Sequence, residues 1–204
     1  MITVVGVRPL LLLMALSAAI AIAPASVAAV RAAPVEDVSG PAPVGPPPPE
    51  PDTYRTDKYR SPVPLTLKGA KVLSSADAMK LWSAKTAIFI DVYPHPPKPA
   101  NLPAGTIWRE ATHMTIEDAV WLPNVGYGVL SPEHDAYFRR NLAMLTKGDK
   151  AKPLVFFCLR NCWMSWNAAK RALSYGYSHV DWYRDGSDGW QEAGGFIVDA
   201  HPLP

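Results

Sequence analysis

Residues 153–169 read P-L-V-F-F-C-L-R-N-C-W-M-S-W-N-A-A, and this stretch decides how the rest of the chain is interpreted. The continuous apolar run from Pro153 to Phe157 predicts a strand buried on both faces. The run delivers one thiol, Cys158, and a second, Cys162, follows four residues later. From Ser165 to Tyr175 the pattern is helical, and a glycine closes it. The stretch therefore predicts a strand, a short loop with two thiols and a helix.

Strand and helix patterns alternate on both sides of this stretch. Further strands are expected at residues 71–73, 87–92, 106–108 and 178–183. Further helices are expected from Ser74 or Ser75 through Leu81, from the Ser131-Pro132-Glu133 start to about Leu145, and around residues 189–193. This alternation predicts an α/β fold with a mostly parallel central sheet flanked by helices. Ligands of such sheets bind at the carboxyl ends of strands, which is where Cys158 is expected.

The beginning of the chain has the composition of an export signal followed by a spacer. Arg8, an apolar run from Leu10 to Ile22 and small residues through Ala29 predict a secretory signal peptide over residues 1–29. An uncleaved anchor is the alternative, but the run is short for a membrane span, which needs roughly 20 apolar residues. The Pro-rich residues 30–66 predict a linker, and residues 67–204 a single folded domain. We expect an exported protein with no stable membrane span after signal cleavage.

Charge and cysteine content exclude several classes of function. The chain has 20 basic and 18 acidic residues spread evenly, with no basic stripe that would bind nucleic acid. Two cysteines four residues apart are not a disulfide framework, because framework cysteines join distant segments in several pairs. The five histidines are scattered, so we expect no zinc site, and nothing in the sequence calls for a cofactor.

The position of Cys158 favours a reactive thiol. Backbone N–H groups and the positive end of the following helix are expected to face it, and both would lower its pKa below the free value of about 8.5. Arg160 would act in the same sense, and the amide of Asn161 can donate a hydrogen bond to an anion in the loop. Cys162 could resolve a persulfide or mixed disulfide at Cys158, or form a disulfide with it if the Cα atoms come within about 6.8 Å.

From about residue 71 to residue 197 the sequence resembles a rhodanese-like domain. The resemblance rests on the order and spacing of Ile90-Asp91-Val92, Cys158, Ala168-Ala169, Leu173, Gly176-Tyr177, Val180, Gly186, Trp190 and Ala193-Gly194. Residues 162–169 and 121–124 look, more closely, like a group of exported proteins named for a CXXCW motif and for association with PQQ-dependent alcohol catabolism. The resemblance implies a periplasmic, sulfurtransferase-like protein that acts on small sulfur species or on thiols and disulfides. Its implied partner is a PQQ dehydrogenase or a cytochrome c.

The loop departs from the family pattern in two respects. Ordinary sulfurtransferase loops of this fold resemble C-x-x-G-x-R-S, whereas this loop is one residue longer and has Met164 before Ser165, where an Arg is expected. Three residues, and not the two of the motif name, separate the cysteines. The resemblance therefore implies neither anion binding by a loop Arg nor thioredoxin-like redox properties.

The predicted site has three kinds of residue. The thiols of Cys158 and Cys162 are predicted to be catalytic. Asp91, at the end of a strand, is predicted to support the loop by accepting backbone hydrogen bonds. Residues predicted to contact substrate or partner are Arg160, Asn161, Trp163, Met164 and Ser165.

Two alternatives of a different class stay open. In the first, the protein is a non-catalytic binding module for a quinoprotein or cytochrome, the two cysteines form a permanent disulfide, and Trp163 contacts the partner. In the second, the longer loop serves a phosphatase-like activity, although Met164 in place of Arg disfavours phosphate binding.

Overall fold

The computed structural model describes residues 1–2, 38, 40–96, 98, 101–109 and 112–204. The chain divides into two units, residues 1–30 and 31–204, and every helix and strand described belongs to the second. Apart from its first two residues, the predicted signal peptide lies outside the described residues. Within the described ranges, no helix has the length and apolar character that a membrane crossing requires.

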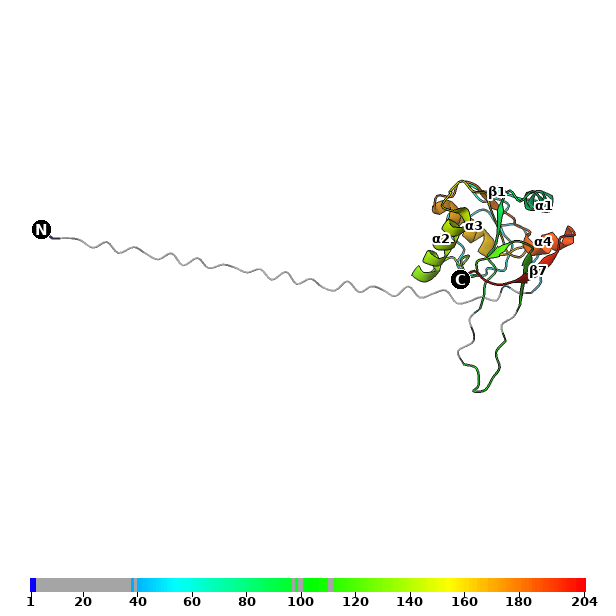
Figure 1. The fold of residues 1–204 in the computed structure, drawn as a ribbon, viewed down its shortest axis with the longest axis horizontal. Coiled ribbons are helices and arrows are strands. Elements are labelled where there is room, and N and C mark those ends of the chain that lie inside the picture. Colours follow the sequence, from blue (N-terminus) through cyan, green and yellow to red (C-terminus); the bar gives the residue numbers. More distant parts are fainter. Residues whose placement is uncertain (3–37, 39, 97, 99–100, 110–111) are drawn as a thin grey trace. The chain divides into compact units, whose positions relative to one another are not determined.

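A five-stranded parallel sheet forms the centre of the domain (Figure 1). Its order is β1 (Lys71–Val72), β6 (Val180–Trp182), β5 (Leu154–Phe157), β2 (Ile88–Asp91) and β4 (Val120–Trp121). Two further strands, β3 (His113–Ile116) and β7 (Ile197–Ala200), form a separate antiparallel pair. The predicted α/β class with a mostly parallel sheet is confirmed.

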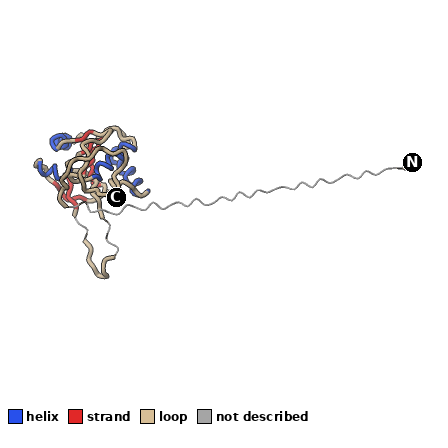
Figure 2. The backbone as a smooth tube through the Cα atoms, turned by 180° about the vertical axis from the view of Figure 1, so that it is seen from behind, coloured by secondary structure: helices blue, strands red, loops and turns tan. Residues whose placement is uncertain are grey.

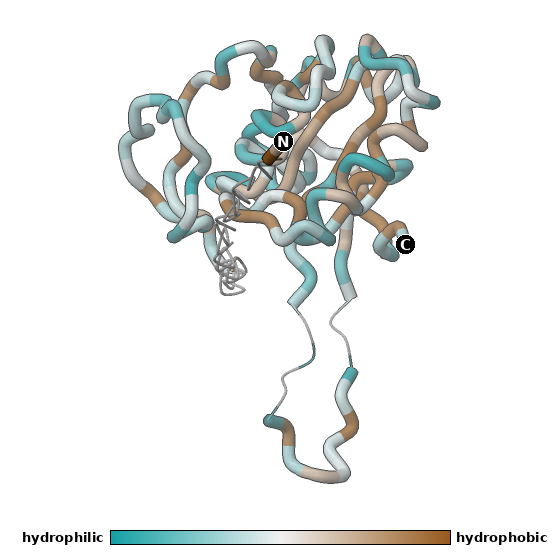
Figure 3. Tube along the Cα trace, turned by 90° about the vertical axis from the view of Figure 1, so that its left-hand side faces the viewer, coloured by the Kyte–Doolittle hydropathy of each residue, from teal (hydrophilic) through white to brown (hydrophobic). Residues whose placement is uncertain are grey.

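Four helices cover the two faces of the sheet (Figure 2). Alternate residues of the central strands face opposite sides, because the side-chain period of a strand is two. Phe156 packs with α2 (Pro132–Thr146) and α3 (Trp163–Ser174), whereas Phe157 packs with α1 (Ser75–Ser83) and α4 (Gly186–Glu192). Hydrophobic segments accordingly run through the interior of the domain (Figure 3). Burial on both faces explains why the central strands read as continuous apolar runs.

Local capping signals place two helices as predicted. The Ser74 hydroxyl accepts a hydrogen bond from the N–H of Asp77 at 3.1 Å, and α1 follows it. The Ser131 hydroxyl accepts one from the N–H of His134 at 3.3 Å, and proline occupies the start of α2. Each cap satisfies an N–H that has no partner inside its helix. The other two helices begin earlier than expected, α3 at Trp163 and α4 at Gly186.

The strand expected at residues 106–108 is wrong. These residues lie in a long loop that projects from the domain, and Ile107 is 84% exposed (Figure 3). The chain forms a strand later, at β3, which pairs with β7 in a two-stranded sheet. The short apolar run at residues 106–108 has no partner strand among the residues that the structure describes. β3 has one in β7, which lies more than 80 residues further along the chain and could not be recognised from local sequence. The sequence predicted neither β3 nor β7, because their stability comes from this distant pairing.

Residues 40–67, here called the strap, cross the end of the sheet that carries the cysteines. The boundary between the linker (residues 30–66) and the domain (residues 67–204) remains a prediction of the sequence. In the structure, side chains from the predicted linker belong to the hydrophobic core. Tyr59 and Val63 are buried in the same cluster as both cysteines, together with Leu67, the first residue of the predicted domain. The backbone N–H of Trp163 donates to the carbonyl of Tyr59 at 2.8 Å. The Pro-rich composition therefore describes a strap that packs on the domain.

Candidate functional site

The two thiols face each other at the carboxyl end of the central strand. Cys158 directly follows β5, and Cys162 is the N-cap residue of α3. Their sulfur atoms are 2.8 Å apart, and both thiols are free. Each residue is only 1% exposed. The structure therefore brings together the two residues that the sequence singled out as a thiol pair, and it encloses them.

Burial governs the chemistry of Cys158. It raises the pKa of this thiol well above its ordinary value, and the neighbouring Cys162 and the charge of Asp91 act in the same direction. The hydrogen bond from the N–H of Leu159 opposes them but is the weaker effect. The expectation of a lowered pKa at Cys158 is therefore wrong. The helix N-terminus on which that expectation rested lies at Cys162.

Gly186 lets two backbone segments meet behind the thiols. Its φ is +54°, and a Cβ atom there would lie 2.2 Å from the carbonyl oxygen of Cys158. The same carbonyl accepts a hydrogen bond from the N–H of Ser187 at 2.9 Å. This close approach ties the cysteine loop to the start of α4, and only glycine has room for it.

The two polar residues of the loop make their hydrogen bonds to α4 and to the strap. The Arg160 guanidinium makes two hydrogen bonds of 2.6 Å to the Glu192 carboxylate, an arrangement that charge assistance strengthens. The backbone N–H of Arg160 donates to Asp188 at 3.0 Å. The Asn161 amide donates to the carbonyl of Pro43 in the strap at 2.8 Å. Their predicted role in binding an anion stays a prediction, and the contacts observed fasten the loop to α4 and to the strap.

Three other predicted residues are buried under the strap or in the core. The Trp163 indole N–H lies 3.0 Å from the Ser61 hydroxyl, which accepts its hydrogen bond. Met164 packs against Gly126, where an added Cβ would come within 2.4 Å of the Met164 carbonyl. The Ser165 hydroxyl donates to the carbonyl of Cys162 at 3.1 Å. In the structure these three residues hold the loop and α3 in place.

Asp91 is the centre of a buried polar cluster. One carboxylate oxygen accepts the N–H of Tyr93 at 2.8 Å, so the carboxylate holds the chain directly after β2. The other accepts the Thr115 hydroxyl at 2.6 Å and lies 2.7 Å from Nε2 of His113. The His113 ring stacks on that of Tyr93 and packs against Trp121. Sequence analysis missed His113 and Thr115, because no motif joins them to an acid more than 20 residues earlier.

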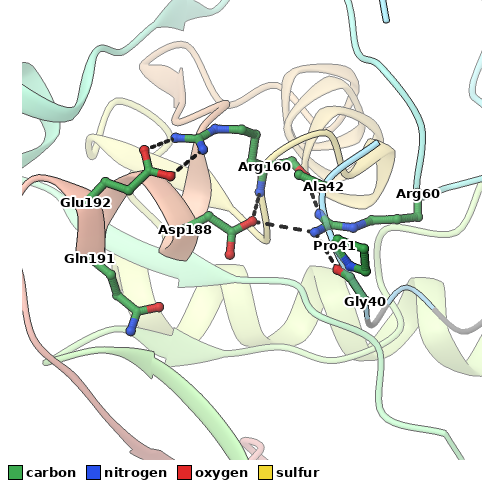
Figure 4. A pocket seen from close by; sticks show the side chains of 8 residues that line it. All are labelled: Gly40, Pro41, Ala42, Arg60, Arg160, Asp188, Gln191 and Glu192. Atoms are coloured by element: carbon green, nitrogen blue, oxygen red, sulfur yellow. Dashed lines mark hydrogen bonds and ion pairs between the residues drawn. The ribbon is translucent and has the colours of Figure 1, made fainter. Parts of the chain in front are cut away.

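A polar pocket of about 410 Å³ lies on the outer side of the cysteine loop, between the strap and α4 (Figure 4). It is lined by Gly40, Pro41, Ala42, Arg60, Arg160, Asp188, Gln191 and Glu192. Arg60 and Cys162 form an antiparallel backbone bridge, so the pocket adjoins the thiol pair. Arg60 lies in the predicted linker, and no motif in the sequence pointed to it as a residue of the site. In the part of the chain that is described, no three His, Cys, Asp or Glu side chains are grouped as a metal site.

Comparison of the sequence with protein-family models and with curated proteins finds no match in either set. Among solved structures the chain is similar to a thiosulfate sulfurtransferase from Pseudomonas aeruginosa, with 16% identity and a TM-score of 0.44. That match covers 65% of this chain and 21% of the other, so the chain spans about a fifth of the length of that protein.

A second similarity is to a polysulfide-sulfur transferase homodimer from Wolinella succinogenes, with 20% identity and a TM-score of 0.39, covering 64% of this chain and 79% of the other. A third is to an uncharacterized protein from Saccharomyces cerevisiae, with 19% identity and a TM-score of 0.37, covering 61% and 93%.

Proposed function

We propose that this chain is a rhodanese-like thiol protein that handles sulfane sulfur or exchanges thiols and disulfides through Cys158 and Cys162. The observation that carries the proposal is the pair of free thiols, 2.8 Å apart, at the carboxyl end of β5. Parallel α/β sheets bind their ligands at this edge. A sulfur atom at this distance from another can form a disulfide, in which the bond is about 2.05 Å, with little movement of the backbone.

The second thiol determines what becomes of a persulfide on the first. Attack of the Cys162 sulfur on the inner sulfur of a Cys158 persulfide forms the disulfide and breaks the persulfide bond. The outer sulfur leaves as H₂S, which takes the proton of the persulfide and that of the Cys162 thiol; this sulfur is reduced while the two cysteines become oxidised to the disulfide. A small thiol or a dithiol protein must then reduce the disulfide before the next turnover. The same pair can reduce a partner's disulfide by exchange.

A non-catalytic role is favoured by one observation, the enclosure of both sulfur atoms under the strap. A permanent disulfide in this position would fasten the start of α3 to the end of β5, and the protein would act as a binding module. We keep this as the second candidate function.

Intact-mass analysis of the full chain, with a free-thiol count, tests both candidates. We expect reduced wild-type protein treated with a persulfide donor to release sulfide and to lose two thiols without keeping an adduct. The Cys162→Ser variant should instead retain one additional sulfur atom, which dithiothreitol removes, and Cys158→Ser should retain none. If neither single variant retains an additional sulfur atom, and the variant with both cysteines changed to Ser binds its partner as well as wild type does, the sulfur chemistry is contradicted and the binding module is supported.

We further propose that the protein acts in the periplasm beside PQQ-dependent alcohol oxidation, with a PQQ dehydrogenase or cytochrome c as partner. The support is the export-type sequence at residues 1–29 and the resemblance around residues 121–124 and 162–169. Cell fractionation of the tagged full chain, followed by cross-linking in alcohol-grown cells, tests both parts. Recovery in the cytoplasm would refute the location, and cross-links that include no quinoprotein or cytochrome would refute the partner.

A further inference from the structure

The pocket of Figure 4 presents charges of both signs to one cavity. Arg60 lies 3.5 Å from the carboxylate of Asp188, and Arg160 is paired with that of Glu192 (Figure 4). The volume of about 410 Å³ falls within the range of small-molecule sites, which starts at about 300 Å³. A cavity of this volume is larger than a small inorganic anion needs. Its two carboxylates would also repel such an anion.

Arg60 has a donor without an acceptor. Its side chain is only 9% exposed. One terminal nitrogen donates to the carbonyl of Arg160 and the other to that of Gly40, the latter at 3.0 Å. The buried Nε–H has no hydrogen-bond partner among the residues described. Buried N–H groups are nearly always paired, so this one indicates an acceptor that comes from outside the chain.

We propose that the pocket binds the zwitterionic part of a small thiol, or of its persulfide or disulfide. The carboxylate of the ligand accepts from Arg60, and its ammonium group lies against Asp188 and Glu192. An amino acid or short peptide that carries a thiol has this charge pattern, whereas thiosulfate has only the negative part. The proposal rests on the proposed function, because it names the substrate class of the same thiol pair.

Position supports this assignment. Arg160 belongs to the cysteine loop itself, and the backbone of Arg60 bridges to that of Cys162. A ligand held by its charged groups in the pocket therefore lies against the outer side of the loop that holds both thiols. Movement of the strap, which carries Arg60, would expose the buried sulfur atoms on the side of the pocket.

Calorimetric titration of the reduced full chain with S-methylglutathione tests the proposal. This probe is a thioether and cannot exchange with the cysteines, so it reports binding alone. We expect saturable binding to wild type that Glu192→Gln weakens about tenfold, through loss of the charge opposite the ammonium group. The same variant should bind thiosulfate more tightly than wild type, because it frees the guanidinium of Arg160. Glu192 is more than half exposed, so the change leaves the fold intact.

Arg60→Gln should abolish binding of the probe, with circular dichroism to show that the domain is folded. The matched control is Arg139→Gln. It removes a surface arginine that pairs with Asp135 at 2.7 Å outside the pocket, and it should leave the affinity for the probe unchanged. Tighter binding of thiosulfate than of S-methylglutathione by wild type, or equal binding of the probe by wild type and Glu192→Gln, would overturn the proposal. Failure of sulfur chemistry in the mass experiment, with probe binding intact, would overturn only the proposed function.

Discussion

Raising the pH of the reduced protein from about 8.0 to about 9.5 should destabilise it through Cys158. The pKa of this thiol is raised in the folded protein by burial, by Cys162 and by the charge of Asp91. The unfolded chain therefore loses the thiol proton at lower pH than the folded chain does. Between the two pKa values the folded state binds more protons, so the free energy of unfolding falls as the pH rises. Below the unfolded pKa of about 8.5 the contribution is fully present.

The size of this change in the free energy of unfolding follows from the ionisation of one thiol, that of Cys158. An unfolded thiol with a pKa of about 8.5 gains about 1.2 kcal/mol from ionisation between pH 8.0 and 9.5, whereas the folded thiol gains almost nothing. Buried tyrosines act mostly above this window, because burial raises the pKa of Tyr137 to about 12 and also raises those of Tyr175 and Tyr183, and their unfolded forms ionise near pH 10. Of the groups whose pKa is raised in the folded protein, Cys158 therefore contributes most over this interval.

Urea denaturation at several pH values in this interval, with a phosphine reductant present, measures the effect. Between pH 8.0 and 9.5 the free energy of unfolding of wild type should fall by about 1.2 kcal/mol more than that of Cys158→Ser. Any cost of the substitution that does not depend on pH cancels in this comparison. The comparison removes contributions from the titrating groups that do not interact with Cys158. Equal pH dependence in the two proteins would show that Cys158 ionises in the fold as easily as in the unfolded chain, and the argument from burial would fail.

Three further predictions concern the supports of the site. Gly186→Ala should lower the free energy of unfolding by about 3 kcal/mol, because its Cβ would collide with the carbonyl of Cys158. In a thermal melt the control Gly148→Ala, at φ +80° with open space around it, should cost only about 1 kcal/mol. Arg171→Lys should cost about 3 kcal/mol in urea denaturation, because a buried guanidinium donates to three carbonyl oxygens at 2.9–3.0 Å; an unchanged midpoint would refute this. Tyr59→Phe removes a hydroxyl that accepts a buried backbone N–H at 3.0 Å, and it should speed alkylation of the reduced thiols several-fold by loosening the strap. Unchanged alkylation kinetics would show that the strap does not control access.

Local signals in the sequence were enough to predict four of the five strands of the central sheet and the helices that the structure describes, but not β4, because proline and glycine in residues 121–128 indicated irregular structure. The apolar runs that became β2 and β5, and the caps at Ser74 and Ser131, depend on neighbours within a few residues. The thiol pair was predictable for the same reason, because Cys158 and Cys162 share one loop. Features of this kind need no knowledge of the rest of the fold.

Contacts between distant residues explain what the sequence could not predict. The pairing of β3 with β7, and the cluster of His113 and Thr115 around Asp91, join segments that no pattern connects. The pKa of Cys158 was predicted in the wrong direction because burial under the strap outweighs any favourable loop geometry. A Pro-rich composition is typical of linkers, and it gave no sign that Arg60 would lie over the cysteine loop.

The strap also has a consequence for the exposure of the thiols. Its contact with the cysteine loop joins residues 100 positions apart, from Arg60 to Arg160, and the pairing of β1 with β6 joins Lys71 to Asp181 across a similar length of chain. Both contacts therefore close long chain loops at a similar entropic cost. In any state in which the strap is not docked, both thiols are open to solvent, and an oxidant or sulfur donor meets them freely. Such a state presents to its surroundings a dithiol that the folded protein conceals.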